Sequence, residues 1–322
     1  MDIQEYISEL KETEKPAPEF EGKWEKKNRN LNVAAIVGLL GIGALYFNMQ
    51  SILATITTLV TMSLGPELQT DGNYFERLAA NMEVFNDPLR VVVLITQFLF
   101  MLLPTVLLVK WWHTKNVKKY IRLNKTSFGE IILAVLATLA IIPAGNYVSN
   151  ELVRWINIPD FYLEISVMFF KANSPLEFIW LIFVVAITPA ICEEVFFRGY
   201  VQRNFERTIK FKSVLLVGFI FGLFHMQPLG LFTLSILGML FGYFYYKSKS
   251  LLPAMAAHFT NNFLAVLILY NPEPIQQFNL AAIEQIPLEW ILITLPIGIG
   301  LVYLYKIVAE RRVSQSMLNK LS

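Results

Sequence analysis

The sequence PLEFIWLIFVVAITPAICEEVFFRGYVQ, residues 175–202, decides what kind of protein this chain is. Upstream of Glu193, its only charged residue is Glu177. A helix of roughly 20 mostly apolar residues is long enough to cross the hydrocarbon core of a membrane. The stretch therefore predicts a transmembrane helix whose last turns carry Glu193, Glu194 and Arg198. Ionisable groups are costly inside a membrane, and by default they are expected to face an interior cavity and to have a function.

The composition of the whole chain agrees with a membrane protein. Of its 322 residues, 55% are hydrophobic and 16% are charged, and the mean hydropathy is +0.50, far from the values of soluble domains. The net charge of +2 gives no indication of a nucleic-acid partner. A single cysteine, Cys192, excludes an intrachain disulfide and a multi-cysteine metal cluster. Residues 1–30 are too polar for the apolar core of a cleaved signal peptide, so we expect the first span to be retained.

Apolar runs that could cross a membrane occur along the whole chain. They cover residues 33–63, 89–111, 129–150, 176–200, 213–227, 229–247, 251–270 and 289–308. We therefore predict an all-α fold, a polytopic membrane helical bundle with about eight transmembrane helices. The first run is too long for one untilted helix, and its polar middle at residues 48–51 leaves one or two spans open.

Lys and Arg residues decide between these two possibilities, because they concentrate in cytoplasmic loops. The basic clusters lie within residues 23–29, 110–125, 203–212, 247–249 and 306–312. With one span in the first run, all five clusters fall on the same side, so we predict one span and cytoplasmic positions for both termini. The exterior loops are then expected at 64–88, 151–175 and 271–288. Residues 158–170 are interpreted as an interfacial segment.

The two adjacent glutamates differ in their expected partners. Glu194 and Arg198 are four residues apart with the acid first, the favourable order for an ion pair on a helix. Glu193 lies about 100° away around the helix and has no obvious partner there. Because a buried carboxylate without a counter-charge can exchange a proton near neutral pH, Glu193 is the better candidate for a reactive group. The alternative is that both glutamates belong to structural ion pairs.

Two of the three histidines lie in apolar runs. His225 is expected mid-span in the run 213–227, and His258, followed four residues later by Asn262, mid-span in the run 251–270. Counting about 1.5 Å per residue from the cytoplasmic helix ends places Glu193 and His258 roughly 10 to 12 Å deep, and His225 and Asn262 about 18 Å deep. A carboxylate, two imidazoles and an amide in one layer are the groups that water-mediated amide hydrolysis requires.

These residues also carry a resemblance to a known family. The segments EEVFFRGYVQ, FGLFH and HFTNN, which begin at residues 193, 221 and 258, resemble the signatures E-E-x-x-x-R, F-x-x-x-H and H-x-x-x-N of the CAAX prenyl protease and bacteriocin-processing family, also called the Abi family. The resemblance covers about residues 175–270, and no signature position departs from the pattern. It implies an intramembrane protease.

The resemblance also implies a role for each residue. It makes Glu193 the general base and His225 its partner on the attacking water. It assigns His258 and Asn262 to the oxyanion, and it makes Glu194 and Arg198 the pair that holds the site together.

The predicted function is therefore that of an intramembrane endopeptidase, which hydrolyses a peptide bond of a membrane-associated or lipid-modified peptide or protein with activated water. The expected partners are this substrate and the lipid bilayer, with no nucleic acid. We expect a multi-pass protein of a bacterial plasma membrane, with its active site open toward the cytosolic side. A proton-coupled transporter is the main alternative, because Glu, His and Arg also form proton relays in membranes. A non-catalytic membrane scaffold that retains the motifs is another.

A metal ion is a further open alternative. Glu193, His225 and His258 could form a zinc site with two histidines, one carboxylate and an open position for water. The sequence has no H-E-x-x-H pair. We favour a glutamate mechanism that uses no metal.

Other features receive simpler interpretations. Cys192 is read as a small buried hydrophobe rather than a nucleophile, and His113 as part of an aromatic and basic interfacial belt. Pro189 is expected to kink its helix and to free backbone groups. The predicted organisation is a cytosolic tail at 1–30, N-terminal membrane helices with the interfacial segment at 31–175, a catalytic membrane core at 176–270, and the exterior loop, last helix and cytosolic C-terminus at 271–322.

Overall fold

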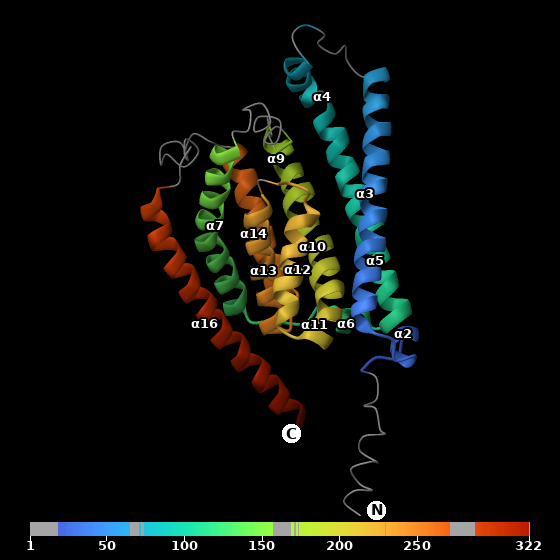
Figure 1. Cartoon of the computed structure of the whole chain (residues 1–322), viewed down its shortest axis with the longest axis vertical. Helices are drawn as coiled ribbons and strands as arrows, with labels where there is room; N and C mark the ends of the chain where they lie inside the picture. Colours follow the sequence, from blue (N-terminus) through green and yellow to red (C-terminus); the bar gives the residue numbers. More distant parts are fainter. Residues whose placement is uncertain are drawn as a thin grey trace, which may run out of the picture.

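The computed structural model describes residues 19–64, 71, 74–156, 169–170, 172, 174–228, 230–270 and 287–321. All regular secondary structure in these ranges is helical, as predicted, and the long helices run side by side as a bundle (Figure 1). Four π-helical segments, labelled η, continue neighbouring α-helices without a break.

The elements follow the chain in this order: α2 (Lys23–Lys26), α3 (Leu31–Leu64), α4 (Tyr74–Ile95), η1 (Thr96–Leu102), α5 (Leu103–Leu108), η2 (Val109–His113), α6 (Val117–Tyr120), α7 (Phe128–Ile156), α9 (Pro175–Leu181), η3 (Ile182–Ile187), α10 (Thr188–Glu194), η4 (Val195–Gln202), α11 (Arg203–Ile209), α12 (Lys212–Phe224), α13 (Leu231–Ser248), α14 (Leu252–Tyr270) and α16 (Leu288–Leu321).

In the described part of the chain, six helices are long and apolar enough to cross a membrane, and each corresponds to one of the predicted runs. They are Leu31–Leu64, Val84–His113, Phe128–Leu152, Pro175–Ile209, Leu252–Tyr270 and Leu288–Ser316. The first is one continuous helix of 34 residues, in agreement with a single span. The two other predicted runs form α12, which has only 13 residues, and α13. These two helices pack against each other.

The expected loops are only partly loops. In the predicted loop 64–88, α4 already begins at Tyr74 and continues through Pro88 into the membrane run. In the loop 151–175, α7 extends to Ile156. Nearly all of the predicted interfacial segment 158–170, and most of the loop 271–288, lies outside the described residues.

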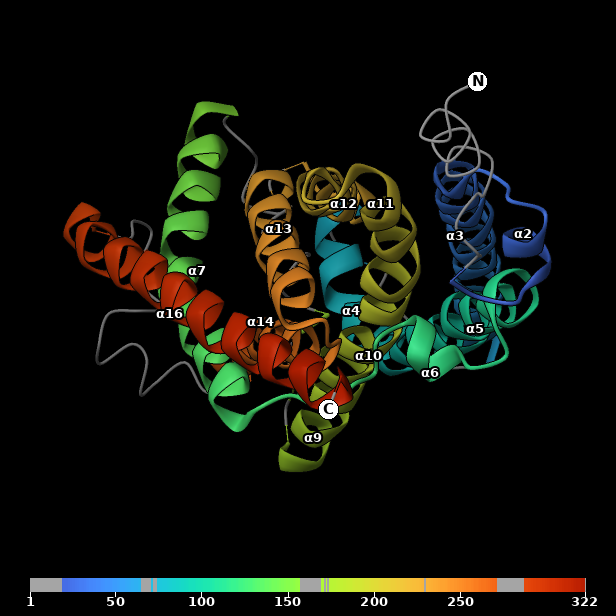
Figure 2. The same cartoon turned by 90° about the horizontal axis from the view of Figure 1, so that it is seen from below.

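The helices form three groups, two outer pairs and one central group. α3 packs on α4, α16 packs on α7, and the chain from α9 to α14 lies between these pairs (Figures 1 and 2). α2 and the C-terminal end of α16 are at the same end of the bundle (Figure 1). Their placement in the cytoplasm remains a prediction from the basic clusters.

Glycines bring α12 and α13 into close contact. Both helices contain a G-x-x-x-G spacing, at Gly218 and Gly222 and at Gly238 and Gly242, a pattern that lets membrane helices approach closely. A Cβ atom on Gly238 would lie 2.6 Å from the Gly218 carbonyl oxygen. The backbone of α13 therefore reaches into the bundle centre.

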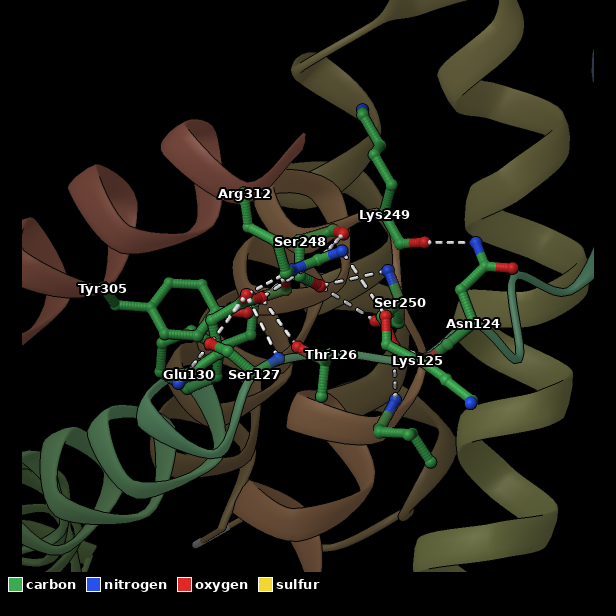
Figure 3. Close-up of polar contacts among 12 residues, drawn as sticks. Asn124, Lys125, Thr126, Ser127, Glu130, Ser248, Lys249, Ser250, Tyr305 and Arg312 are labelled. Atoms are coloured by element: carbon green, nitrogen blue, oxygen red, sulfur yellow. Dashed lines mark hydrogen bonds and ion pairs between the residues drawn. The ribbon is translucent and has the colours of Figure 1, made fainter. Parts of the chain in front are cut away.

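A polar network fixes the end of the bundle at which α7 begins (Figure 3). Glu130 of α7 accepts hydrogen bonds from Thr126 and from Arg312 of α16. Arg312 also donates to the Ser248 carbonyl at the end of α13, at 2.5 Å. Ser250, just before α14, donates to the Asn124 carbonyl at 2.7 Å. These contacts join α7, α13, α14 and α16 and so fix the start of the helix that carries His258.

Candidate active site

The two carboxylates of the site come from the last residues of α10, where the helix continues into η4. Glu194 is fully buried and Glu193 is 8% exposed. Their side chains leave the helix in different directions and meet different partners, as their adjacent positions on a helix require.

Glu194 is the centre of a closed cluster. Its Oε1 accepts hydrogen bonds from Arg198 Nη1 and from His258 Nδ1, both at 2.8 Å. Arg198 is fully buried, and its Nη2 donates to the Gly238 carbonyl at 2.9 Å. The predicted ion pair between Glu194 and Arg198 is therefore confirmed. Because α13 approaches closely, the Gly238 carbonyl is the second acceptor for Arg198.

Glu193 is in a more open arrangement. Its Oε1 accepts a hydrogen bond from Gln97 Nε2 at 2.9 Å. Its Oε2 has no hydrogen-bond partner among the described residues and lies 3.9 Å from His225 Nε2. That distance is too long for a direct hydrogen bond. Oε1 of Glu193 is therefore fixed by a hydrogen bond, whereas Oε2 faces the His225 imidazole without a direct hydrogen bond.

His225 lies at the end of a helix, which corrects the prediction that it lies mid-span. α12 ends at Phe224, because Met226 adopts a left-handed φ of 51° and Pro228 follows. His225 Nδ1 is 2.8 Å from the Phe221 carbonyl oxygen. An Nδ1–H that donates to this carbonyl leaves Nε2 as the acceptor that faces Glu193.

His258 and Asn262 lie one turn apart on α14 but have different partners. Asn262 Nδ2 donates to the Val185 carbonyl at 2.8 Å, and its Oδ1 accepts from Asn261 at 3.0 Å. Val185 is four residues before Pro189, which has no N–H to donate to that carbonyl. As expected, the proline frees a backbone group, and Asn262 binds it. Among the described residues, the Asn262 amide makes no hydrogen bond to the other five candidate residues.

Phe221 connects the two halves of the site. Its ring centre is 4.5 Å from the Arg198 guanidinium, 4.7 Å from the His225 ring and 5.6 Å from the His258 ring. The expected contact between Phe221 and His225 is therefore present. Phe241 stacks on the other side of His258 at 5.3 Å. Three candidate residues, Arg198, His225 and His258, thus surround one aromatic ring.

Sequence reasoning missed Gln97 as a part of this site. It is the only side-chain amide in the predicted run 89–111, and a polar residue in such a run was an available signal. Gly238 and Phe241 were missed as well. They contribute a backbone oxygen and a ring face; the G-x-x-x-G spacing of Gly238 and Gly242 was an available signal of close helix packing, whereas Phe241 has no distinctive sequence pattern.

The proposed zinc ligands do not form a common binding group. In the described part of the chain, no three His, Cys, Asp or Glu side chains are arranged to share one ion. His258 directs Nδ1 to Glu194, whereas Glu193 faces His225. The residues as placed do not fit the zinc site considered from the sequence.

Two further residues can now be placed. Cys192 is fully buried in the hydrophobic core, as a small apolar residue would be. His113 was assigned to an interfacial belt, but this is wrong: it is fully buried, and its Nδ1 lies 2.7 Å from Glu25 Oε1. The N-terminal segment around α2 folds back onto η2 and covers it.

Comparison with known proteins supports the family resemblance. Residues 175–264 match a family model described as type II CAAX prenyl endopeptidase Rce1-like. The match contains all six candidate residues. No curated protein and no solved structure matches the chain. The chain is an integral, multi-pass membrane protein by its helices, and its segment 175–264 is Rce1-like, consistent with the CAAX prenyl protease and bacteriocin-processing family.

Proposed function

We propose that this protein is an intramembrane endopeptidase that uses water to cleave a peptide bond in a membrane-associated or lipid-modified substrate. The observation that carries the proposal is the pair formed by Glu193 Oε2 and His225 Nε2. Both atoms are free acceptors, and they face each other across 3.9 Å. A water molecule can hydrogen-bond to both across such a distance.

In this mechanism Glu193 and His225 remove a proton from the attacking water. The carbonyl of Phe221 fixes the His225 tautomer by accepting from Nδ1, at 2.8 Å. The Gln97 amide holds Oε1 of Glu193, so that Oε2 receives the proton. The proton then passes to the leaving amine, which restores the carboxylate.

The second pair stabilises the oxyanion that forms on the substrate carbonyl. His258 binds Glu194 through Nδ1, and we assign its Nε2 to the oxyanion as a hydrogen-bond donor. Asn262 has two amide hydrogens, of which one binds the Val185 carbonyl and the second remains for the oxyanion. Glu194 and Arg198 orient His258 and take no direct part in the chemistry.

No step of this mechanism uses a metal ion, and the three proposed ligands have separate partners. The test is prolonged treatment of the purified protein with a strong chelator. We expect full activity afterwards, and an activity that is lost and then restored by Zn²⁺ alone would refute the glutamate mechanism.

The cellular function is tested by comparing membrane and secreted proteomes. Cells carry the wild type, Glu193→Gln, His225→Ala or the control Thr105→Val, which lacks a buried hydroxyl that bonds the Met101 carbonyl. We expect the same peptides to lose their processing in the first two variants only. If both variants equal the wild type while a gene deletion has a phenotype, the protein acts as a scaffold. Loss of solute uptake with unchanged peptides would identify a transporter.

A further inference from the structure

We propose that Gln97 is a positioning residue for Glu193, and that it selects which carboxylate oxygen faces the attacking water. The inference rests on the proposed function. Gln97 lies on η1, outside the segment that matches the family model.

The surroundings of Gln97 leave its amide few partners. The residue is 2% exposed. Its Nε2 donates to Glu193 Oε1 at 2.9 Å and lies 3.5 Å from the Tyr46 hydroxyl of α3. Its own Oε1 has no hydrogen-bond partner among the described residues. A buried amide with an unpaired oxygen lowers the stability of the fold. Such a residue calls for an explanation, and the short bond to Glu193 provides a functional one.

The local helix geometry brings Gln97 to this place. η1 is seven residues of π-helix between α4 and α5, and it packs against both α3 and α10. π-helical turns are uncommon and often lie at functional sites, because they shift the side chains that follow. The Thr96 hydroxyl stabilises the start of this turn through the carbonyls of Val92 and Val93.

The bond to Gln97 makes the two oxygens of Glu193 different. With Oε1 occupied, the carboxylate cannot rotate freely, and Oε2 remains directed at His225. An amide also suits both protonation states of a general base. Its N–H₂ group donates to Oε1 of the carboxylate, and after Oε2 has received the proton it still donates to Oε1, which is then the carbonyl oxygen of the carboxylic acid. Gln97 can therefore hold Glu193 before and after proton transfer.

The test compares Gln97→Met, which keeps the size but cannot hydrogen-bond, with Gln97→Glu, which places a second carboxylate beside Glu193. Thr105→Val is the matched control, since it removes a buried hydrogen bond in the same continuous helix. Each protein is purified in lipid vesicles. Infrared difference spectra over a pH series follow the protonated carboxyl band that disappears in Glu193→Gln.

We expect the midpoint of this band to move upward by about one pH unit in Gln97→Met, because a hydrogen bond to the charged form is lost. It should also move upward in Gln97→Glu through repulsion between carboxylates, and it should stay unchanged in Thr105→Val. Unchanged midpoints in both Gln97 variants would overturn the proposal. If Gln97→Met does not fold, the infrared midpoint of Gln97→Glu is the test of the proposal.

A second measurement separates this proposal from the proposed function. On a peptide that contains an identified cleavage site, Gln97→Met should lower kcat about 10- to 100-fold with little change in KM. The acidic limb of its pH profile should move with the infrared midpoint. A shifted midpoint in a protein whose wild type cleaves nothing would refute proteolysis but support the contact. An unchanged kcat with a shifted midpoint would refute positioning.

Discussion

Glu193 and Glu194 are neighbours in the chain, yet they occupy two different kinds of environment. Glu194 is fully buried, and one of its oxygens accepts two short bonds from cationic or imidazole donors. Each carboxylate has one oxygen without a hydrogen-bond partner among the described residues, but the other oxygen of Glu193 has only a neutral amide donor, and its free oxygen faces His225. The comparison teaches that one helical step is enough to separate a carboxylate that stabilises the protein from one that remains available for chemistry.

The largest expected effect is on the open carboxylate. Glu193→Gln should lower kcat/KM about 10⁴-fold, the upper end of the range for general acid–base catalysis, because no other carboxylate faces His225. Its free energy of unfolding should be close to that of the wild type, since the amide keeps the size and can still accept from Gln97. Kinetics on an identified substrate peptide and reversible unfolding measure the two effects. Residual activity above a tenth of wild type would remove Glu193 from the mechanism.

At the buried Glu194, by contrast, loss of the ion-pair partner should lower the stability of the protein. Arg198→Met leaves Glu194 as a buried charge without its main partner, and we expect unfolding to be easier by about 3–5 kcal/mol. The control is Lys247→Met, which breaks an ion pair to the half-exposed Glu310 and should cost below about 1 kcal/mol. Unfolding in detergent measures both. Equal losses of unfolding free energy in the two variants would show that the buried ion pair of Glu194 contributes no more than the exposed pair of Lys247.

A third buried carboxylate extends the comparison to the N-terminal segment. Burial of Glu25 opposes its ionisation, but hydrogen bonds from His113 and Arg207 outweigh this and lower the pKa of Glu25 to about 2 from its ordinary 4.5. A lowered folded-state pKa stabilises the protein above pH 4.5, and this contribution, at most about 3 kcal/mol, is lost as the pH falls from 4.5 toward 2.

This prediction is measured by hydrogen exchange of residues 19–26. Protection should fall within that pH window in the wild type. In Glu25→Gln it should already be low at pH 7 and should change little on acidification. A wild-type segment that stays fully protected at pH 2 would show that Glu25 does not hold it.

A smaller effect is expected where α13 supports the closed cluster. Gly238→Ala would place a Cβ atom 2.6 Å from the Gly218 carbonyl, so α12 and α13 must separate. We expect a loss of about 1–3 kcal/mol in unfolding free energy. Gly41→Ala is the control, because a Cβ there meets no atom within 4 Å and alanine favours a helix. A Gly238→Ala protein as stable as Gly41→Ala would show that α12 and α13 can separate at this contact without loss of stability.

The smallest effect concerns the residue next to the open carboxylate. Cys192→Ala should leave kcat/KM within about twofold of the wild type, since the thiol is buried in the apolar core and has no part in the proposed proton transfers. Stability should fall by about 1 kcal/mol, a typical cost for removing one buried atom group. A loss of activity comparable to that of Glu193→Gln would make Cys192 the nucleophile instead.

Features that depend on local spacing and composition could be predicted from the amino-acid sequence. Apolar runs predicted the six helices that can cross a membrane, and the four-residue spacing of Glu194 and Arg198 predicted their ion pair. The three motifs indicated the family segment. These inferences succeeded because helix geometry fixes the neighbours of a residue within one or two turns.

Contacts between helices, in contrast, became known only from the three-dimensional structure. The bond from Gln97 to Glu193 joins residues 96 positions apart, and the bond from His258 to Glu194 joins residues 64 positions apart. The burial of His113 beneath the segment around α2 and the position of His225 at a helix end were likewise unforeseen. Such contacts depend on how whole helices pack, at a glycine surface or a π-helical turn, and local spacing carries no information about them.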